Sequence, residues 1–269
     1  MMLFQRPQPP RRTVGLALSG GAVRGAAHVG VLQVLEREGI RPAIVAGTSV
    51  GALVGAAFAA GRDPGELSRI FHTIRWPKLT RISLGRFMGL LDTGPIERVF
   101  GEIVGKDRIE ALPTPFAAVA CDLLTGEEVV FREGPVGRIL RASAAVPGVF
   151  PPVELDDRLL VDGCVVNNLP IDVVRSMGAD YVIAVDLVPP PSGGRRPRNA
   201  LEVMMISAYL WSRANHPEPD SAEAYIVPDI AEYLGWDFDD VPELEARGRA
   251  AAELLVPQLR RDLGRAQPG

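Results

Sequence analysis

The sequence predicts an α/β fold in which a parallel sheet is covered by helices. Two short apolar runs, Val14–Leu18 and Ala43–Ala46, are typical of buried parallel strands. Each is followed by a glycine-rich turn and then by a helical pattern, Ala26–Glu38 and Ala52–Ala60. With 269 residues, 47% of them hydrophobic and 23% charged, the chain has the length and composition of one large globular domain or two small ones.

The remaining elements continue this alternation with less regular spacing. Helical patterns cover Pro64–Ile74, Pro95–Val104, Pro135–Ser143, Pro170–Met177, Ala200–Arg213 and Val241–Arg265. Strand patterns cover Phe116–Asp122, Glu127–Phe131, Val153–Leu155, Leu159–Val161, Tyr181–Asp186 and Ala224–Val227. The proline- and glycine-rich stretch Val188–Asn199 is typical of an exposed loop.

Charge and scarce reactive residues exclude several classes of function. Lys+Arg 29 against Asp+Glu 33 gives a net charge of −4, which argues against a general nucleic-acid binder. Cys121 and Cys164 are too few for a disulfide scaffold or an all-thiolate zinc site. The three histidines, His28, His72 and His216, limit any histidine-based chemistry. Because no signal peptide or bilayer-spanning apolar run is evident, we expect a cytoplasmic protein.

Gly47-Thr-Ser49-Val-Gly51 matches the G-x-S-x-G pattern of a nucleophile elbow. In this motif a sharp turn between a strand and a helix projects the serine hydroxyl away from the backbone, and the flanking glycines permit that turn. An apolar strand pattern precedes the motif and a helical pattern follows it. The sequence therefore favours Ser49 as a nucleophile over a plain glycine-rich turn.

A second glycine-rich loop, Gly20–Gly25, also follows a strand and opens a helix. A dinucleotide site would need glycine where Ala22 stands and a carboxylate after the next strand, and both are missing. A phosphate-binding P-loop would need Lys and Ser or Thr after Gly25, where two alanines stand. The remaining use is an oxyanion hole, whose N–H groups stabilise the negative oxygen of an acyl-transfer intermediate.

A serine nucleophile needs a base, and two kinds are available. In the chain order of an α/β-hydrolase only His216 lies far enough downstream, within a polar loop. The alternative is Asp162, which ends an apolar strand pattern just before Gly163. Burial of such a carboxylate raises its pKa and makes it a better proton acceptor. An ordinary Asp-Gly turn is the other interpretation of this pair.

Four blocks together resemble the bacterial patatin-like phospholipases. They are Leu18–Leu32, Gly47–Ala52, Ala142–Pro152 and Val161–Pro170, in the order found in that family, and the resemblance spans about Thr13 to Leu187. It implies a three-layer α/β/α fold with a central, mostly parallel sheet. We accordingly divide the chain into a disordered arm (1–12), a patatin-like catalytic core (13–187), and a loop plus C-terminal helices packed on the same domain (188–269).

The resemblance implies an enzyme that hydrolyses acyl esters of glycerolipids through a Ser–Asp dyad, without histidine, metal ion or other cofactor. Ser49 would be the nucleophile and Asp162 the general base, with Gly47 and Gly51 shaping the elbow. The oxyanion hole would comprise Gly20, Gly21, Ala22 and Val23, while Arg24 and Gly25 would fix the loop or contact a head group.

Two positions depart from the family pattern. Ala22 stands where the family usually has glycine, so a positive φ there is less accessible. Cys164 replaces the small residue that usually follows Asp-Gly. An alternative function is therefore a lipid-binding regulatory protein with a weak or inactive dyad.

The segment 69–91 carries Arg69, Arg75, Lys78, Arg81 and Arg86 and no acidic residue, with apolar side chains interleaved. Basic and apolar residues together suit anionic membrane surfaces, although a solvated protein face is the alternative. We expect a lipid ester as substrate, peripheral contact with the inner face of a membrane through this segment, and no nucleic-acid partner. The sequence does not indicate an oligomeric state.

Overall fold

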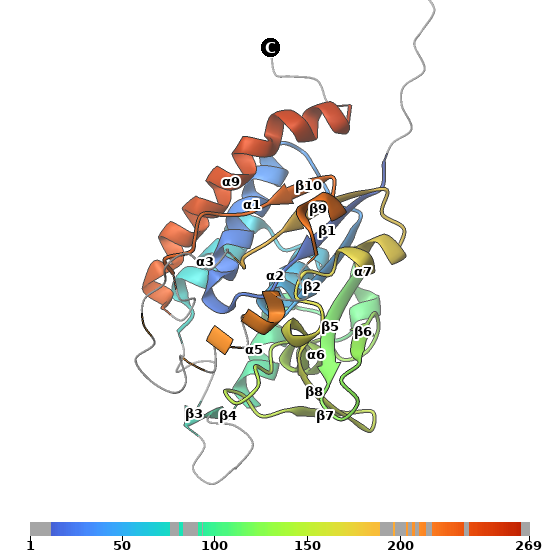
Figure 1. Cartoon of the computed structure of the whole chain (residues 1–269), viewed down its shortest axis with the longest axis vertical. Helices are drawn as coiled ribbons and strands as arrows, with labels where there is room; N and C mark the ends of the chain where they lie inside the picture. Colours follow the sequence, from blue (N-terminus) through green and yellow to red (C-terminus); the bar gives the residue numbers. More distant parts are fainter. Residues whose placement is uncertain are drawn as a thin grey trace, which may run out of the picture.

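The computed structural model describes residues 12–75, 81–82, 91–92, 94–188, 196, 203, 206–207, 210–213, 217–233 and 237–264. Within these residues the chain forms a mixed α/β fold around one large sheet (Figure 1). Three stretches of interest lie partly or wholly outside the described residues: the arm before residue 12, most of the basic segment 69–91, and half of the helix expected over Ala200–Arg213. His216 also lies outside them.

The strands at one end of the sheet are parallel, and those at the other end pair in antiparallel fashion. Its strand order is β10-β9-β1-β2-β5-β8-β7, and β6 pairs with β5 off this path. The parallel strands are β1 (Val14–Leu18), β2 (Ile44–Thr48), β5 (Phe116–Asp122), β9 (Tyr181–Val185) and β10 (Ala224–Ile226). The antiparallel strands are β6 (Glu128–Phe131), β7 (Val153–Leu155) and β8 (Arg158–Asp162).

Helices cover both faces of the sheet, as the sequence predicts. One face packs against α1 (Ala26–Arg37), α2 (Val50–Ala59), α3 (Pro64–Thr73), α5 (Gly94–Val104), α6 (Val136–Ser143) and α9 (Val241–Asp262). The other face packs against α7 (Ile171–Ser176), visible on the opposite side of the molecule (Figure 1). Two-residue strands β3 (Arg81–Ile82) and β4 (Leu91–Asp92) form a small separate ribbon, which was not predicted from the sequence.

The C-terminal part of the chain completes the domain. Helix α9 lies along α1, and glycines allow the two backbones to approach closely (Figure 1). A Cβ on Gly30 would lie 2.1 Å from the carbonyl oxygen of Glu245, and one on Gly248 would lie 2.0 Å from that of Ala27. No helix within the described ranges is long and apolar enough to cross a membrane.

A buried carboxylate joins the three helices on this side. Glu245 of α9 is 5% exposed and accepts hydrogen bonds from Gln33 (2.9 Å), Ser68 (2.7 Å) and Arg249 (2.6 Å). His72 Nε2 lies 3.3 Å from the same carboxylate. Burial raises the pKa of Glu245, but these hydrogen bonds outweigh it and the pKa is lowered overall.

We expect Glu245→Ala to lower the free energy of unfolding by about 3 kcal/mol, because it removes a buried acceptor and leaves several partly buried donors without it. Because the folded pKa is depressed, this stabilisation is present above the unfolded pKa and is lost as the pH falls through the folded value. Urea unfolding at pH 8 and pH 4 measures both effects. Glu253→Ala is the control, since Glu253 pairs with Arg37 at the surface of α9, and a cost below about 1 kcal/mol is expected there. An equal loss in the free energy of unfolding for Glu245→Ala and Glu253→Ala would contradict a stabilising role for the buried Glu245 carboxylate.

Candidate active site

Ser49 occupies a strained turn between β2 and α2. Its φ of 56° and ψ of −125° lie in a region that non-glycine residues rarely adopt. Gly47 and Gly51 make the turn sterically feasible: a Cβ on Gly47 would lie 2.4 Å from the Gly51 carbonyl, and one on Gly51 would lie 2.3 Å from the Leu18 carbonyl oxygen. The backbone therefore has the shape that the G-x-S-x-G motif predicts.

Ser143, at the end of α6, holds this turn from the side. The N–H of Ser49 donates to Ser143 Oγ (2.9 Å), and that hydroxyl donates to the carbonyl oxygen of Val119 on β5 (2.6 Å). Ser143 is fully buried. The strained conformation of Ser49 is thus fixed by a buried hydrogen bond that links the elbow to α6 and to the sheet.

Asp162 ends β8 and reaches the elbow through the register of the sheet. Thr48 pairs with Val119 across β2 and β5, and the next residue of β5, Ala120, pairs with Asp162. The structure therefore brings together the two residues predicted as nucleophile and base, and the Ser49 hydroxyl is a hydrogen-bonding neighbour of the Asp162 carboxyl. Cys164 also donates its backbone N–H to Asp162 Oδ1 (2.9 Å).

Burial controls the titration of Asp162, which is 1% exposed. The loss of hydration raises its pKa to about 6, although hydrogen bonds from Cys164 and Ser49 oppose the shift. A carboxyl group in this range is a stronger proton acceptor than one in water and is still ionised at neutral pH.

We expect kcat/KM for ester hydrolysis to rise with pH and to reach half its maximum near pH 6, because a general base must be deprotonated. This rise of kcat/KM with pH follows from the raised pKa of Asp162 in the folded protein. Below about pH 6 Asp162 is protonated and cannot act as a base, and above it Asp162 is ionised. Initial rates from pH 4.5 to 9 test this. A midpoint near pH 4, where an exposed aspartate titrates, would contradict the assignment.

The loop after β1 forms the other side of the site. It turns into a short 3₁₀ helix, Ala22–Gly25, and Ala22 adopts a φ of 53° although it is not glycine. The sequence suggests that alanine would disfavour this conformation, yet the loop retains it, at a cost of about 1 kcal/mol. Ala22 and Val23 line the same pocket as Ser49.

The amide of Gly20 has a different role from the one predicted. It donates to both Asn168 Oδ1 and the Asn168 carbonyl, each at 3.2 Å, so in this conformation it is not free to bind an oxyanion. The first N–H groups of a helix have no partner inside it. Of the four predicted oxyanion donors, the backbone N–H groups of Gly21, Ala22 and Val23 therefore remain as candidates.

Arg24 and Gly25 support the loop. The Arg24 side chain is 7% exposed and its Nε donates to the Gly21 carbonyl (3.3 Å), which favours the loop-fixing role over contact with a head group. Gly25 packs tightly on the elbow helix, since a Cβ there would lie 2.2 Å from Val50 Cγ2. The two glycine-rich motifs are therefore packed directly against each other.

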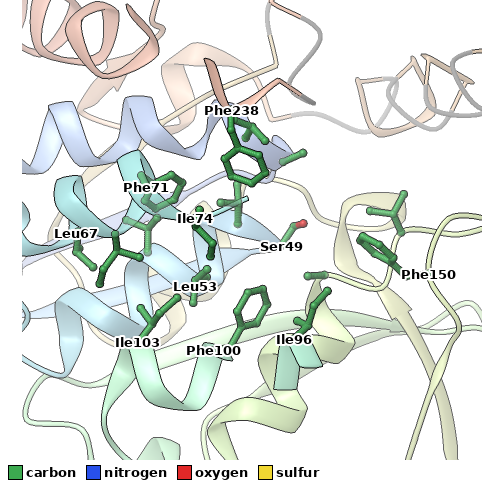
Figure 2. A pocket seen from close by; sticks show the side chains of 17 residues that line it. Ser49, Leu53, Leu67, Phe71, Ile74, Ile96, Phe100, Ile103, Phe150 and Phe238 are labelled. Carbon is green, nitrogen blue, oxygen red and sulfur yellow. The ribbon is translucent and has the colours of Figure 1, made fainter. Parts of the chain in front are cut away.

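An apolar pocket opens beside Ser49 (Figure 2). Figure 2 shows its labelled side chains around the serine, with Phe71 and Phe238 on one side and Ile96, Phe100 and Ile103 on the other. The lining comes from the Ala22–Val23 loop, α2, α3, α5, the segment 144–150 and Phe238. Apart from Ser49, the described residues that line it are apolar.

The described histidines are placed differently from a catalytic base. His28 is fully buried in α1, where Nε2 donates to the Ser19 carbonyl (2.8 Å), and burial lowers its pKa to about 4. His72 lies beside Glu245. In the part of the chain that the structure covers, no cluster of three or more His, Cys, Asp or Glu could hold a metal ion.

The family model for "Patatin-like phospholipase" matches residues 16–175, which include both glycine-rich motifs and Asp162. The chain belongs to this family. The predicted membership of the patatin-like phospholipases and the predicted α/β fold are thereby confirmed, and both predicted dyad residues lie inside the matched range.

Relatives in sequence support the same membership. An uncharacterized NTE family protein of Mycobacterium tuberculosis is 42% identical over 182 residues, covering 65% of this patatin-like chain and 49% of the relative. Patatin-like phospholipase domain-containing protein 6 of Mus musculus is 34% identical over 237 residues, covering 82% of this chain and 16% of the relative. This chain thus spans about half the length of the mycobacterial protein and a smaller part of the mouse protein.

Solved structures share the fold at low sequence identity. VipD from Legionella pneumophila superposes with a TM-score of 0.61 at 13% identity, covering 93% of this patatin-like chain and 67% of VipD. The type III effector protein ExoU gives a TM-score of 0.53 at 14% identity, covering 93% and 54%. At such identities the likeness shows the fold alone.

Proposed function

We propose that this protein is a serine acyl hydrolase that cleaves fatty-acyl ester bonds of phospholipids or lysophospholipids. One observation carries the proposal: a strained serine, next to a buried aspartate of raised pKa, opens directly into an apolar pocket. An apolar pocket beside a nucleophile suits an acyl chain, because transfer of each methylene out of water contributes about 0.8 kcal/mol.

The reaction would proceed through an acyl-enzyme. Ser49 Oγ attacks the ester carbonyl carbon while its proton passes to Asp162, and the carbonyl oxygen becomes an oxyanion facing the N–H groups of Gly21–Val23. The C–O bond then breaks, and the leaving alcohol takes the proton from Asp162. A water molecule next attacks the acyl-enzyme as Asp162 accepts its proton. Ser49 regains a proton and the fatty acid departs.

We expect Phe238→Ala to raise KM for long-chain esters about 10-fold, because a missing aromatic wall removes about 1.4 kcal/mol of acyl-chain contact. Turnover of a short acetyl ester, which does not fill the pocket, should stay within about twofold of wild type. Rates with acetyl and palmitoyl esters measure the difference. Leu124→Ala, on a side chain that is 71% exposed, is the control. An equal loss on both esters would contradict a role in acyl binding.

The function itself is tested by fatty-acid release from a panel of phospholipids, lysophospholipids and monoacylglycerols. The proposal predicts release from at least one ester and none by Ser49→Ala. Lipid binding without release by the wild-type protein would instead support the alternative, a lipid-binding regulatory protein with an inactive dyad.

We also propose that the basic segment 69–91 contacts anionic membrane surfaces, on the strength of its five positive and interleaved apolar residues. Sedimentation with vesicles containing phosphatidylserine tests this. Substituting Arg81, Arg86 and Phe87 together should reduce binding, and unchanged binding would contradict the proposal.

A further inference from the structure

The peptide group between Ser19 and Gly20 is held at both ends by two buried residues, His28 and Asn168. Its carbonyl oxygen accepts from His28 Nε2 (2.8 Å), and its N–H donates to Asn168 Oδ1 and to the Asn168 carbonyl (both 3.2 Å). Since a carbonyl oxygen only accepts, Nε2 of His28 carries the proton. Nδ1 of His28 is buried and has no hydrogen-bond partner among the described residues.

Ser19 is restrained in the same way at its other polar atoms. Its N–H donates to the Val185 carbonyl (3.1 Å), and its hydroxyl accepts from the N–H of Leu187 (2.8 Å) and donates to the Gly20 carbonyl (3.2 Å). Ser19 and His28 are fully buried and Asn168 is 5% exposed. Buried hydrogen bonds of this kind fix orientation because breaking one leaves an unpaired polar group.

The Ser19–Gly20 peptide lies close to the three parts of the site: the nucleophile, the segment that carries the base, and the predicted oxyanion loop. A Cβ on Gly20 would lie 2.6 Å from Asn168 Oδ1 and 3.2 Å from Ser49 Cβ. Asn168 follows Asp162 in the same segment, and the residues after Gly20 are the predicted oxyanion donors. One peptide group therefore connects the segment that carries the base, the nucleophile and the loop.

We propose that His28 and Asn168 are positioning residues for the acyl-transfer reaction. By clamping the Ser19–Gly20 peptide, they aim the N–H groups of Gly21–Val23 at the oxygen that becomes negative on attack by Ser49. Neither side chain exchanges a proton with the substrate. This inference rests on the proposed hydrolase function.

Kinetics of matched variants test the proposal. Asn168→Ala and His28→Leu should each lower kcat per fluorophosphonate-reactive site about 10- to 100-fold with KM unchanged, because the oxyanion exists only in the transition state. His28→Gln, which retains a donor, should restore at least part of the rate. The midpoint of the pH profile near 6 should not move. Asn167→Ala is the control, since the Asn167 side chain bonds Glu128 and Asp172 near the surface.

Amide hydrogen exchange provides a readout that does not depend on turnover. Exchange at residues 19–25 should accelerate in Asn168→Ala and His28→Leu and remain at the wild-type rate in Asn167→Ala. Two results would contradict the positioning role of His28 and Asn168. One is unchanged exchange at residues 19–25 in Asn168→Ala and His28→Leu, and the other is a kcat per reactive site within twofold of wild type in both of these variants. If the wild-type protein neither reacts with the probe nor releases fatty acid, the hydrolase function fails, and exchange alone decides whether the clamp exists.

Discussion

Ser49→Ala is expected to lower kcat/KM for lipid-ester hydrolysis by about 10⁵-fold, because alanine lacks the hydroxyl that would form the acyl-enzyme. Fatty-acid release with a sensitive fluorogenic ester measures the residual rate. The effect should be confined to chemistry, so KM for the residual reaction and binding of a non-hydrolysable ether lipid should remain close to wild type.

Ser49→Gly provides a second, independent test of the elbow. Glycine adopts the backbone angles of Ser49 without strain, whereas alanine does not. Both variants should be inactive, but Ser49→Gly should unfold with a free energy about 1 kcal/mol higher than Ser49→Ala. Equal stabilities would show that the turn is not strained, and substantial activity in either variant would exclude Ser49 as the nucleophile.

Asp162→Asn is expected to lower kcat/KM by about 10³- to 10⁴-fold, because the amide occupies the same space but cannot accept the proton of Ser49. The same substitution should stabilise the fold. Burial raises the pKa of Asp162 from 3.8 to about 6, and a shift of about two units corresponds to about 3 kcal/mol.

The pH dependence of that stabilisation follows from linkage. Below about pH 4 Asp162 is protonated in both states, so wild type and Asp162→Asn should be equally stable. Between pH 4 and 6 the unfolded state loses its proton first, and the wild type becomes less stable with rising pH. Above pH 6 the difference should be constant. A variant no more stable than wild type at pH 8 would contradict the buried-carboxylate account, and retained activity would exclude Asp162 as the base.

The framework of the fold could be predicted because its strands and glycine turns are local patterns. Val14–Leu18 and Phe116–Asp122 are strands over the predicted residues, since each is a short apolar run bounded by polar or turn residues. The predicted strand Leu159–Val161 extends one residue further at each end and finishes on Asp162. Its antiparallel pairing with β5, which brings Asp162 beside Ser49, is set by long-range contacts.

Residues that act through distant partners were not predicted from the sequence. Ser143 and Asn168 each bond a residue far away in the chain, and His28 bonds Ser19 from the helix that follows the loop. Nothing in their local pattern indicates these partners. All three lie inside blocks that carry the family resemblance, which was the available signal. Phe238 reaches the pocket from the C-terminal part of the chain, which carries no motif and lies beyond the family model.

The central claim, that Ser49 is a nucleophile activated by Asp162, is tested most directly by reaction with a fluorophosphonate followed by mass spectrometry of the labelled peptide. The account predicts one adduct per chain, located on Ser49, that is absent in Ser49→Ala and forms at least 100-fold more slowly in Asp162→Asn. No adduct on the wild-type protein, an adduct on another residue, or an unchanged rate in Asp162→Asn would contradict it.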